Sequence, residues 1–388
     1  MRTRDLPLDT LADKSYDLIC FSHLRWDFVY QRPQHLMSRA AKERNVYFIE
    51  EPIFQDGETN LIVSQREDNL KVVVPHLSNS MDKRAVDSTM QELIERFVAE
   101  NVPARFVSWY YTPLMLGWTE NLEAAGIVYD CMDELSMFKN APPELCIKEA
   151  ELLAMADLVF TGGRSLYESK RELHPDVYCF PSSIDKEHFG QARTITSETP
   201  DQEGISSPRI GFFGVIDERT DIELLDKLAQ LRPAYQFVMI GPVVKIDEAD
   251  LPRRENIHYL GGKSYNELPA YIAGWNVAMM PFAMNDSTKF ISPTKTPEYL
   301  AAGRPVVSTP IRDVVRPYGE AGLVRIGQSP EAFAVALDEA LKEDLSGHRE
   351  RTDEFLENMS WDNTYYSMFE LIDSVPGLTV EIGSAAAV

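Results

Sequence analysis

A lysine and a glutamate flank the predicted start of a helix in the segment Phe290-Ile-Ser-Pro-Thr-Lys-Thr-Pro-Glu-Tyr-Leu-Ala-Ala-Gly-Arg-Pro-Val-Val307. Pro297 has no backbone N–H group, so it belongs in the first turn of that helix, and Thr294 or Thr296 becomes the expected N-cap. Free backbone N–H groups, the positive helix end and the ammonium group of Lys295 together suit a diphosphate without a metal ion. Glu298, within the first turn, is placed to accept hydrogen bonds from two ribose hydroxyl groups. The same spacing also fits an ordinary helix start at which Lys295 is a solvated surface charge.

Three carboxylates follow a predicted strand in the segment Ile127-Val-Tyr-Asp-Cys-Met-Asp-Glu-Leu135. Transfer of a group to a hydroxyl with inversion needs a base, and a clustered, partly desolvated carboxylate can acquire the raised pKa that this task requires. Asp133 is the preferred candidate for this base. A structural alternative makes Asp130 the cap of a helix or turn and leaves Asp133 solvated. His23, after the first predicted strand, is the competing base, although a lone histidine is more often a hydrogen-bonded structural residue.

The loop at residues 23–35 is dense in aromatic and multidentate polar side chains, among them Arg25, Trp26, Gln31 and Arg32. Sugars offer an apolar face and many hydroxyl groups, so this composition suits the binding of an acceptor glycan. An ordinary loop between a strand and a helix, with Trp26 packed in the core, explains the same residues equally well.

The elements that must position these residues are short apolar runs that alternate with helical patterns along the whole chain. This alternation predicts parallel sheets covered by helices on both faces. The predicted fold is therefore α/β, with two Rossmann-like parallel-sheet domains that face each other across a cleft. The domains are expected at residues 1–190 (acceptor side) and 209–360 (donor side), joined by a polar linker at 191–208 and followed by a helix at 361–375 that returns to the first domain and a tail at 376–388.

The carboxyl ends of two such sheets make the cleft between them the expected ligand site. Neither half opens on Gly-x-Gly-x-x-Gly, and Gly-x-x-x-x-Gly-Lys-Ser/Thr is absent, which argues against a dinucleotide oxidoreductase and a P-loop ATPase. The four cysteines lie far apart and no His-x-x-x-His pair occurs. We therefore expect no disulfide framework, no bound metal and no cofactor other than the substrate.

The formal net charge of -23 disfavours a nucleic-acid binder, because such proteins neutralise phosphates with a basic surface. No apolar run approaches the ~20 residues that a transmembrane helix needs, and the first residues lack a hydrophobic signal region. We expect a cytoplasmic protein without a transmembrane segment, and peripheral attachment to the inner membrane is left open.

The segment Thr296-Pro-Glu-Tyr-Leu-Ala-Ala-Gly-Arg-Pro-Val-Val307 resembles the donor-binding helix of GT-B glycosyltransferases, particularly the family 4 group. Further segments agree with that family in order, namely Pro181-Ser-Ser-Ile-Asp-Lys-Glu-His-Phe189, Phe212-Phe-Gly214 and Tyr259-Leu-Gly-Gly262. The opening Phe21-Ser-His-Leu-Arg-Trp-Asp-Phe-Val-Tyr-Gln-Arg-Pro-Gln-His35 is similar to a bacterial branch that builds surface polysaccharides. The resemblance covers most of the chain and is strongest from residue 181 to residue 307.

The resemblance implies roles for individual residues. Glu298 is expected to bind the donor ribose and Thr294 with Lys295 the diphosphate, while further donor contacts are expected at Gly214, Arg219 and Lys263. Asp133 resembles the catalytic aspartate of some inverting GT-B enzymes, and His23 resembles the histidine that other GT-B enzymes use in that loop.

The sequence also departs from the family pattern. A second glutamate usually precedes the ribose glutamate by eight residues, and Phe290 occupies that position here. The family's arginine and lysine after the Gly214-like glycine fall on Val215 and Thr220, with Arg219 nearby. These departures leave the donor sugar open and weaken the expectation of a retaining reaction.

Together these features predict a metal-independent glycosyltransferase of the hexosyltransferase type, with inversion favoured over retention. The donor is expected to be a nucleotide-diphosphate sugar, UDP-linked by preference, and the acceptor a glycan or glycolipid. One alternative is a nucleotide-sugar epimerase of the same architecture. Another is a noncatalytic sugar-nucleotide binding partner in polysaccharide assembly, which the phenylalanine at position 290 keeps open.

Overall fold

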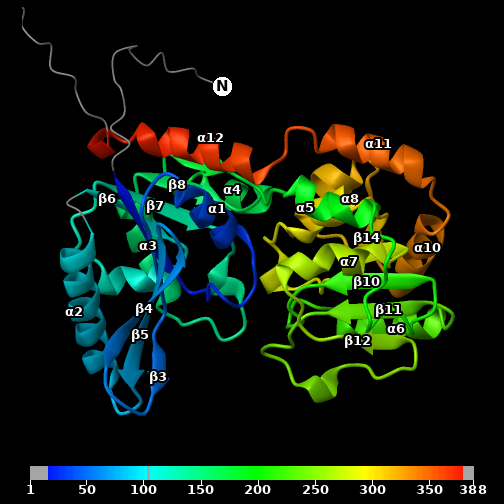
Figure 1. Cartoon of the computed structure of the whole chain (residues 1–388), viewed down its shortest axis with the longest axis horizontal. Helices are drawn as coiled ribbons and strands as arrows, with labels where there is room; N and C mark the ends of the chain where they lie inside the picture. Colours follow the sequence, from blue (N-terminus) through cyan, green and yellow to red (C-terminus); the bar gives the residue numbers. More distant parts are fainter. Residues whose placement is uncertain (1–15, 103–104, 379–388) are drawn as a thin grey trace, which may run out of the picture.

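The computed structural model describes residues 16–102 and 105–378. These residues form two units side by side, each built on one mainly parallel sheet, the first drawn in blue to green and the second in green to orange (Figure 1). The first unit holds strands β1–β9 and the second holds β10–β15. The predicted α/β fold with two Rossmann-like sheets is confirmed. The predicted tail from residue 379 onward and the amino-terminal residues 1–15 lie outside the described residues.

The first sheet has the order β3-β5-β2-β1-β6-β7-β8-β9, with β4 paired to β5. The run β5-β2-β1-β6-β7-β8 repeats the Rossmann order 3-2-1-4-5-6, which reverses between β1 and β6. Ligands of such sheets bind at the carboxyl ends of the strands beside this reversal, so the residues after β1 lie at the expected place. The strands are β1 (Asp17–Ser22), β2 (Val46–Glu50), β3 (Ile53–Gln55), β4 (Asn60–Glu67), β5 (Leu70–Ser78), β6 (Phe106–Tyr110), β7 (Gly126–Cys131), β8 (Leu158–Thr161) and β9 (Val177–Cys179).

The segment from β3 to β5 holds three strands. β4 runs antiparallel to β5, whereas the other pairs of this sheet are parallel. β4 is an edge strand without a buried residue, so its sequence carries no alternation of apolar and polar residues. Hydrophobic patterning finds strands that bury one face in a core, whereas in β4 only Leu61 packs against one.

The second sheet has the order β12-β11-β10-β13-β14-β15, again 3-2-1-4-5-6, with parallel pairing throughout. The reversal between β10 and β13 places the loops after these two strands at the expected ligand position. The strands are β10 (Arg209–Phe213), β11 (Gln236–Ile240), β12 (Ile257–Tyr259), β13 (Val277–Met280), β14 (Val306–Ser308) and β15 (Val324–Ile326).

Helices cover the faces of both sheets. The longer ones are α1 (Arg32–Ala40), α2 (Lys83–Asn101), α3 (Leu145–Met155), α4 (Arg164–Lys170), α6 (Ile222–Leu231), α8 (Lys295–Ala301), α10 (Pro330–Ala340), α11 (Leu345–Phe355) and α12 (Trp361–Asp373). The last of these, drawn in red, lies over the first sheet although it follows the second in the chain (Figure 1). Trp361, Tyr365 and Phe369 from α12 pack into the same buried cluster as Trp109 from β6. The predicted residue limits of the domains stay a prediction.

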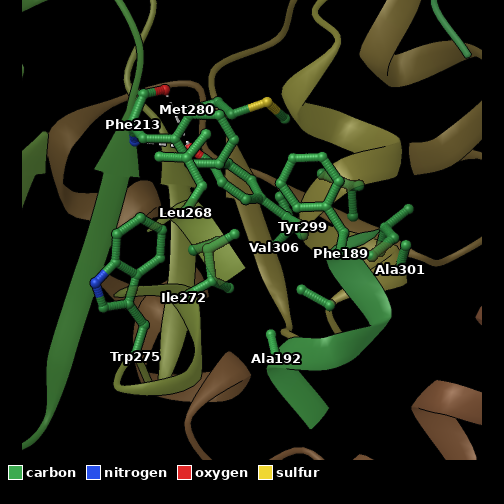
Figure 2. Close-up of a cluster of buried hydrophobic side chains, with 14 of the residues drawn as sticks. Phe189, Ala192, Phe213, Leu268, Ile272, Trp275, Met280, Tyr299, Ala301 and Val306 are labelled. Carbon is green, nitrogen blue, oxygen red and sulfur yellow. Dashed lines mark hydrogen bonds between the residues drawn. The ribbon is translucent and has the colours of Figure 1, made fainter. Parts of the chain in front are cut away.

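A buried cluster in the second unit fixes α8 against β10 (Figure 2). Tyr299 of α8 lies edge-on to Phe213 of β10, with ring centroids 5.0 Å apart, and its hydroxyl oxygen accepts a hydrogen bond from the Phe213 backbone N–H at 2.9 Å. Trp275 closes the cluster from the side. The start of α8 is therefore held beside the residue that follows β10.

Candidate active site

Lys295 and Gly214 lie in direct contact at the start of α8. Gly214 has φ 138°, and a Cβ atom there would lie 2.2 Å from the Lys295 Cε atom, so only glycine fits. Thr294 is the N-cap residue, as one of the two predicted options had it, but its side chain makes no capping hydrogen bond. Pro297 lies in the first turn and Gly303, with φ 72°, follows the helix end. Three of the predicted donor residues are thus brought together.

Glu298 lies buried in the first turn of α8. Its side-chain atom Oε2 has no hydrogen-bond partner among the described residues, although the residue is only 6% exposed. Burial raises the pKa of the Glu298 carboxyl, and the nearby Lys295 ammonium opposes this effect in part. Burial likewise lowers the pKa of Lys295. A buried carboxylate oxygen without a donor is well suited to receive a ligand hydroxyl.

Two further cations from the second unit lie over an aromatic ring of the first unit. The Arg219 guanidinium carbon lies 5.4 Å and the Lys245 ammonium 5.2 Å from the centre of the Phe138 ring. Arg219 is also paired with Asp217, with an Nη2–Oδ2 distance of 2.6 Å. The two units therefore meet at a group of charged side chains beside Lys295.

Asp133 extends from the first unit into this group of charges. Burial raises the pKa of Asp133 to about 6, and Asp217 adds to the rise, whereas Arg219, Lys295 and Lys245 oppose it. Its neighbour Glu134 is held elsewhere, by an ion pair of 2.7 Å with Lys170. Asp133 is thus the carboxylate of the predicted cluster that reaches the donor residues.

His23 lies close to one of these charges, the ammonium of Lys245. Burial lowers its pKa to about 4, and the positive charge of Lys245 adds to the effect. Its Nδ1 atom is buried and, within the part of the chain that the structure describes, has no hydrogen-bond partner. The structure therefore brings both predicted bases to the boundary between the units.

The predicted acceptor residues are largely engaged inside the first unit. Arg25 Nη1 donates to Glu50 Oε2 at 3.0 Å, and the Trp26 ring packs edge-on against Phe48 at 5.0 Å. The Gln31 backbone N–H donates to Gln34 Oε1 at 3.0 Å as the chain enters α1. The alternative of an ordinary strand-to-helix loop describes these contacts, and an acceptor role for Arg25, Trp26 and Gln31 stays a prediction.

Arg32 needs a correction. Its side chain is 2% exposed and forms an ion pair with Asp130, which is fully buried, with an Nη2–Oδ1 distance of 2.8 Å. Its Nη1 atom donates to the Phe180 carbonyl oxygen at 2.8 Å. The expectation that Arg32 contacts an acceptor is therefore wrong for this arrangement, because its side chain is buried and its guanidinium is bound within the first unit. The alternative that Asp130 caps a helix or turn is also wrong, since Asp130 binds Arg32.

Lys263 contacts residues other than those around Lys295. Its ammonium is 2.6 Å from Asp201 Oδ2 and 5.1 Å from the centre of the Tyr271 ring. These contacts give no support to the donor role, which stays a prediction.

Sequence reasoning missed Asp217, Glu218, Lys245 and Phe138 as members of this site. Lys245 follows β11 by five residues, and Asp217 and Glu218 follow β10 by four and five. Their position after the carboxyl ends of parallel strands was the available indication. The sequence gives no such indication for Phe138, because the residues near it in the chain do not show that Arg219 and Lys245 lie over its ring.

Phe290, which replaces the expected second glutamate, packs against a buried cluster of the first unit. Its position therefore serves contact between the units. No group of three or more metal-ligating side chains occurs within residues 16–102 and 105–378. In the same ranges, no helix is both long and apolar enough to cross a membrane. The expected absence of a metal stays a prediction.

Residues 207–343 match the family model described as Glycosyl transferases group 1. TuaH of Bacillus subtilis (strain 168), named for a glycosyltransferase role in teichuronic acid biosynthesis, is 26% identical over 202 residues. This match covers 47% of the chain and 50% of the relative, so the chain spans about half the length of this curated relative.

Several solved structures share the fold over nearly the whole chain. An E. coli structure named for trehalose-6-phosphate and bound with UDP-2-fluoro glucose has a TM-score of 0.68 at 13% identity, covering 93% of this chain and 99% of the other. WaaG, a glycosyltransferase involved in lipopolysaccharide biosynthesis, has a TM-score of 0.61 at 13% identity, covering 92% and 100%. Anabaena Alr3699/HepE in complex with UDP has a TM-score of 0.63 at 12% identity, with the same coverage of 92% and 100%. The chain therefore has the GT-B glycosyltransferase fold, and its second unit matches the glycosyl transferases group 1 family.

Proposed function

We propose that this protein is a metal-independent glycosyltransferase that moves a sugar from a UDP-linked donor onto a glycan or glycolipid acceptor. The observation that carries the proposal is the meeting of Lys295 and Glu298, beside Gly214, with Asp133 from the other unit. UDP and UDP-2-fluoro glucose in structures of the same fold support the uridine nucleotide. The polysaccharide roles in the names of TuaH and WaaG support the acceptor class.

In the proposed reaction, an acceptor hydroxyl attacks the anomeric carbon of the donor sugar. Asp133 takes the hydroxyl proton while the bond between the anomeric carbon and the diphosphate oxygen breaks, so the electron pair leaves with the diphosphate. Lys295 and Arg219 stabilise the negative charge that develops there, which is the task that a metal ion has in other transferases. Glu298 binds the ribose by accepting hydrogen bonds from its hydroxyl groups.

The two candidate bases differ in their acidity. A general base works best when its pKa lies near the working pH, and the pKa of about 6 at Asp133 meets this condition better than the pKa of about 4 at His23. Diphosphate binding adds negative charge beside Asp133 and should raise its pKa further. We therefore assign the base to Asp133 and keep His23 as the second candidate.

A nucleotide screen tests the donor half of the proposal. Thermal unfolding is measured with UDP, GDP, ADP and TDP, because a ligand that binds only the native state raises the apparent stability. UDP should raise the melting temperature most, and addition of EDTA should leave that rise unchanged. Equal melting temperatures with all four nucleotides would contradict the proposed donor.

The noncatalytic alternative is favoured by one observation, the packing of Phe290 where a sugar-binding glutamate is usual. A noncatalytic protein would bind UDP but release no UDP from a donor sugar in the presence of acceptor. An epimerase would yield a free sugar or an epimer without acceptor. Product analysis with and without a surface-polysaccharide acceptor separates the three activities.

A further inference from the structure

The loops after β10 and β11 are joined beyond the ends of their strands. Ile216 and Val243 form an isolated parallel bridge, and the Val244 backbone N–H donates to the Ile216 carbonyl oxygen at 3.0 Å. Glu218 and Lys245 each lie two residues after this bridge. The bridge therefore sets their two side chains next to each other, with Lys245 Nζ 3.8 Å from Glu218 Oε1.

Lys245 is held in an unfavourable backbone conformation. Its φ is 64°, in the left-handed region that residues with a Cβ atom avoid unless their surroundings fix them there. The hydrogen bond from Val244 to Ile216 is one such fixing contact. This conformation directs the lysine over the Phe138 ring of the other unit, and its side chain stays 45% exposed.

Glu218 has a carboxylate that nothing in the described chain satisfies. Both Oε1 and Oε2 are buried, and neither has a hydrogen-bond partner in residues 16–102 or 105–378. Arg219, the next residue, is already bound by Asp217 in a bidentate pair. Lys245 at 3.8 Å compensates the charge of Glu218 but is too far away for a hydrogen bond.

A buried carboxylate with a nearby cation and no donor is a costly arrangement unless a ligand completes it. The position of this carboxylate, in the loop that also provides Gly214 and Arg219, is next to the proposed diphosphate site. The part of a nucleotide sugar that follows the diphosphate is the sugar itself. Two neighbouring hydroxyl groups of a hexose are the donors that a carboxylate with two free oxygens can accept.

We propose that Glu218 binds two adjacent hydroxyl groups of the transferred sugar and that Lys245 is the positioning residue that holds its carboxylate. The inference rests on the proposed function and deepens it, because it assigns the recognition of the sugar to a loop after β10. Glu218 then supplies the carboxylate that the chain lacks at Phe290.

The test compares binding of UDP with binding of UDP-sugars by calorimetry. The panel is UDP-glucose, UDP-galactose, UDP-N-acetylglucosamine and UDP-glucuronate, and the sugar that the wild-type protein binds most tightly serves as the probe. Glu218→Gln should weaken binding of this probe by about 10-fold or more, the size of a lost hydrogen bond to a charged group, and leave UDP affinity within about twofold. Glu218→Asp keeps the charge but shortens the side chain. Its affinity for the probe should therefore lie between those of the wild type and Glu218→Gln.

Glu248→Gln is the matched control, because Glu248 is also acidic and follows β11 in the chain but is exposed. It should change neither affinity. Equal weakening of UDP and the probe in Glu218→Gln would overturn the inference and place Glu218 at the diphosphate. An unchanged affinity for both ligands would overturn it as well. Wild-type protein that binds UDP but gains nothing from any sugar would overturn the inference alone, whereas absence of UDP binding would overturn the proposed function itself.

Lys245→Met tests the positioning role. The variant should lose less affinity for the probe than Glu218→Gln does. It should leave UDP affinity unchanged, since the lysine acts on the sugar through Glu218. In the double variant, loss of Lys245 should add almost nothing to loss of Glu218. A large loss of UDP affinity in Lys245→Met would show that the lysine binds the diphosphate, and its assignment here would be wrong.

Discussion

The two halves of the candidate site differ in what their polar side chains already bind. In the second unit, the carboxylates of Glu298 and Glu218 have buried oxygens that no described residue contacts by a hydrogen bond. In the first unit, the side chains of Arg25 and Arg32 both make hydrogen bonds within that unit. The donor side is therefore unsatisfied without a ligand, whereas most of the proposed acceptor side is satisfied without one.

The difference teaches which sequence patterns carry chemistry. Arginine, glutamine and tryptophan in a loop serve structure as readily as recognition, because their donors and rings fit either. An ammonium group packed against a glycine that has no room for a Cβ atom, as Lys295 is against Gly214, is a more specific sign of a binding site. The close approach leaves fewer structural explanations for the pair. His23 is an exception in the first unit, because its buried Nδ1 atom has no hydrogen-bond partner among the described residues. Variants of Asp133, the other candidate base, test the comparison most directly.

Asp133→Asn should produce the largest effect. Loss of a general base lowers kcat by about 10²- to 10⁴-fold, while nucleotide affinity should not fall, because the substitution removes a negative charge beside the proposed diphosphate position. Steady-state kinetics and calorimetry measure the two quantities, and a melting temperature no lower than that of the wild type excludes misfolding. If the variant keeps its turnover while His23→Ala abolishes it, the base is His23. Retention at the anomeric carbon would also contradict the assignment.

Arg32→Met should show that this arginine belongs to the interior. Removing one member of a buried ion pair leaves Asp130 uncompensated and should lower the free energy of unfolding by about 3 to 5 kcal/mol. Arg39→Met on the same helix is the control, since its partner Asp362 is largely exposed, and should cost less than about 1 kcal/mol. Urea denaturation measures both. A small loss of stability in Arg32→Met together with weaker acceptor binding would restore the acceptor role.

Glu298→Gln and Lys295→Ala sharpen the donor half. Each should weaken UDP affinity by about 1.5 to 3 kcal/mol, because each removes a charge-assisted hydrogen bond to the nucleotide. Calorimetry with UDP measures the change. Unchanged affinity in both variants would contradict the proposed donor site. It would also contradict the contrast between an unsatisfied donor side and a satisfied acceptor side.

The stability of the protein should depend on pH through Asp133. Its pKa rises from 3.8 to about 6 on folding, so its protonated form is favoured in the native state, and the stability that it contributes below pH 4 is lost as the pH rises through 6. Asp133→Asn should therefore melt at a higher temperature than the wild type at pH 8, with the difference vanishing near pH 4. Thermal unfolding at both pH values checks this sign, and a lower melting temperature for the variant at pH 8 would refute it.

Removal of metal should have the smallest effect, namely none. Lys295 and Arg219 supply the positive charge beside the proposed diphosphate position, so turnover should survive EDTA. A loss of turnover that manganese or magnesium restores would contradict this prediction and would point to a divalent ion near Asp130 or Asp133.

The sequence predicted those features that a few neighbouring residues determine. Pro297 and Gly303 limit where α8 can begin and end, and the apolar runs limit where buried strands lie, so the double Rossmann fold and the Lys295–Glu298 helix start were both predictable. The edge strand β4 was not, since an exposed strand leaves no periodic pattern.

Only the tertiary structure decided which charges meet. Arg32 and Asp130 are 98 residues apart and form a buried pair, which turned a predicted ligand contact into a structural one. Asp133 and Glu134 are neighbours in the chain, yet one reaches the cations of the second unit and the other is held by Lys170. The sequence determines residue types and local backbone limits. Coulomb energies and hydrogen bonds depend on distance and burial in space, so the chemistry of each carboxylate was settled by the packing of the two units.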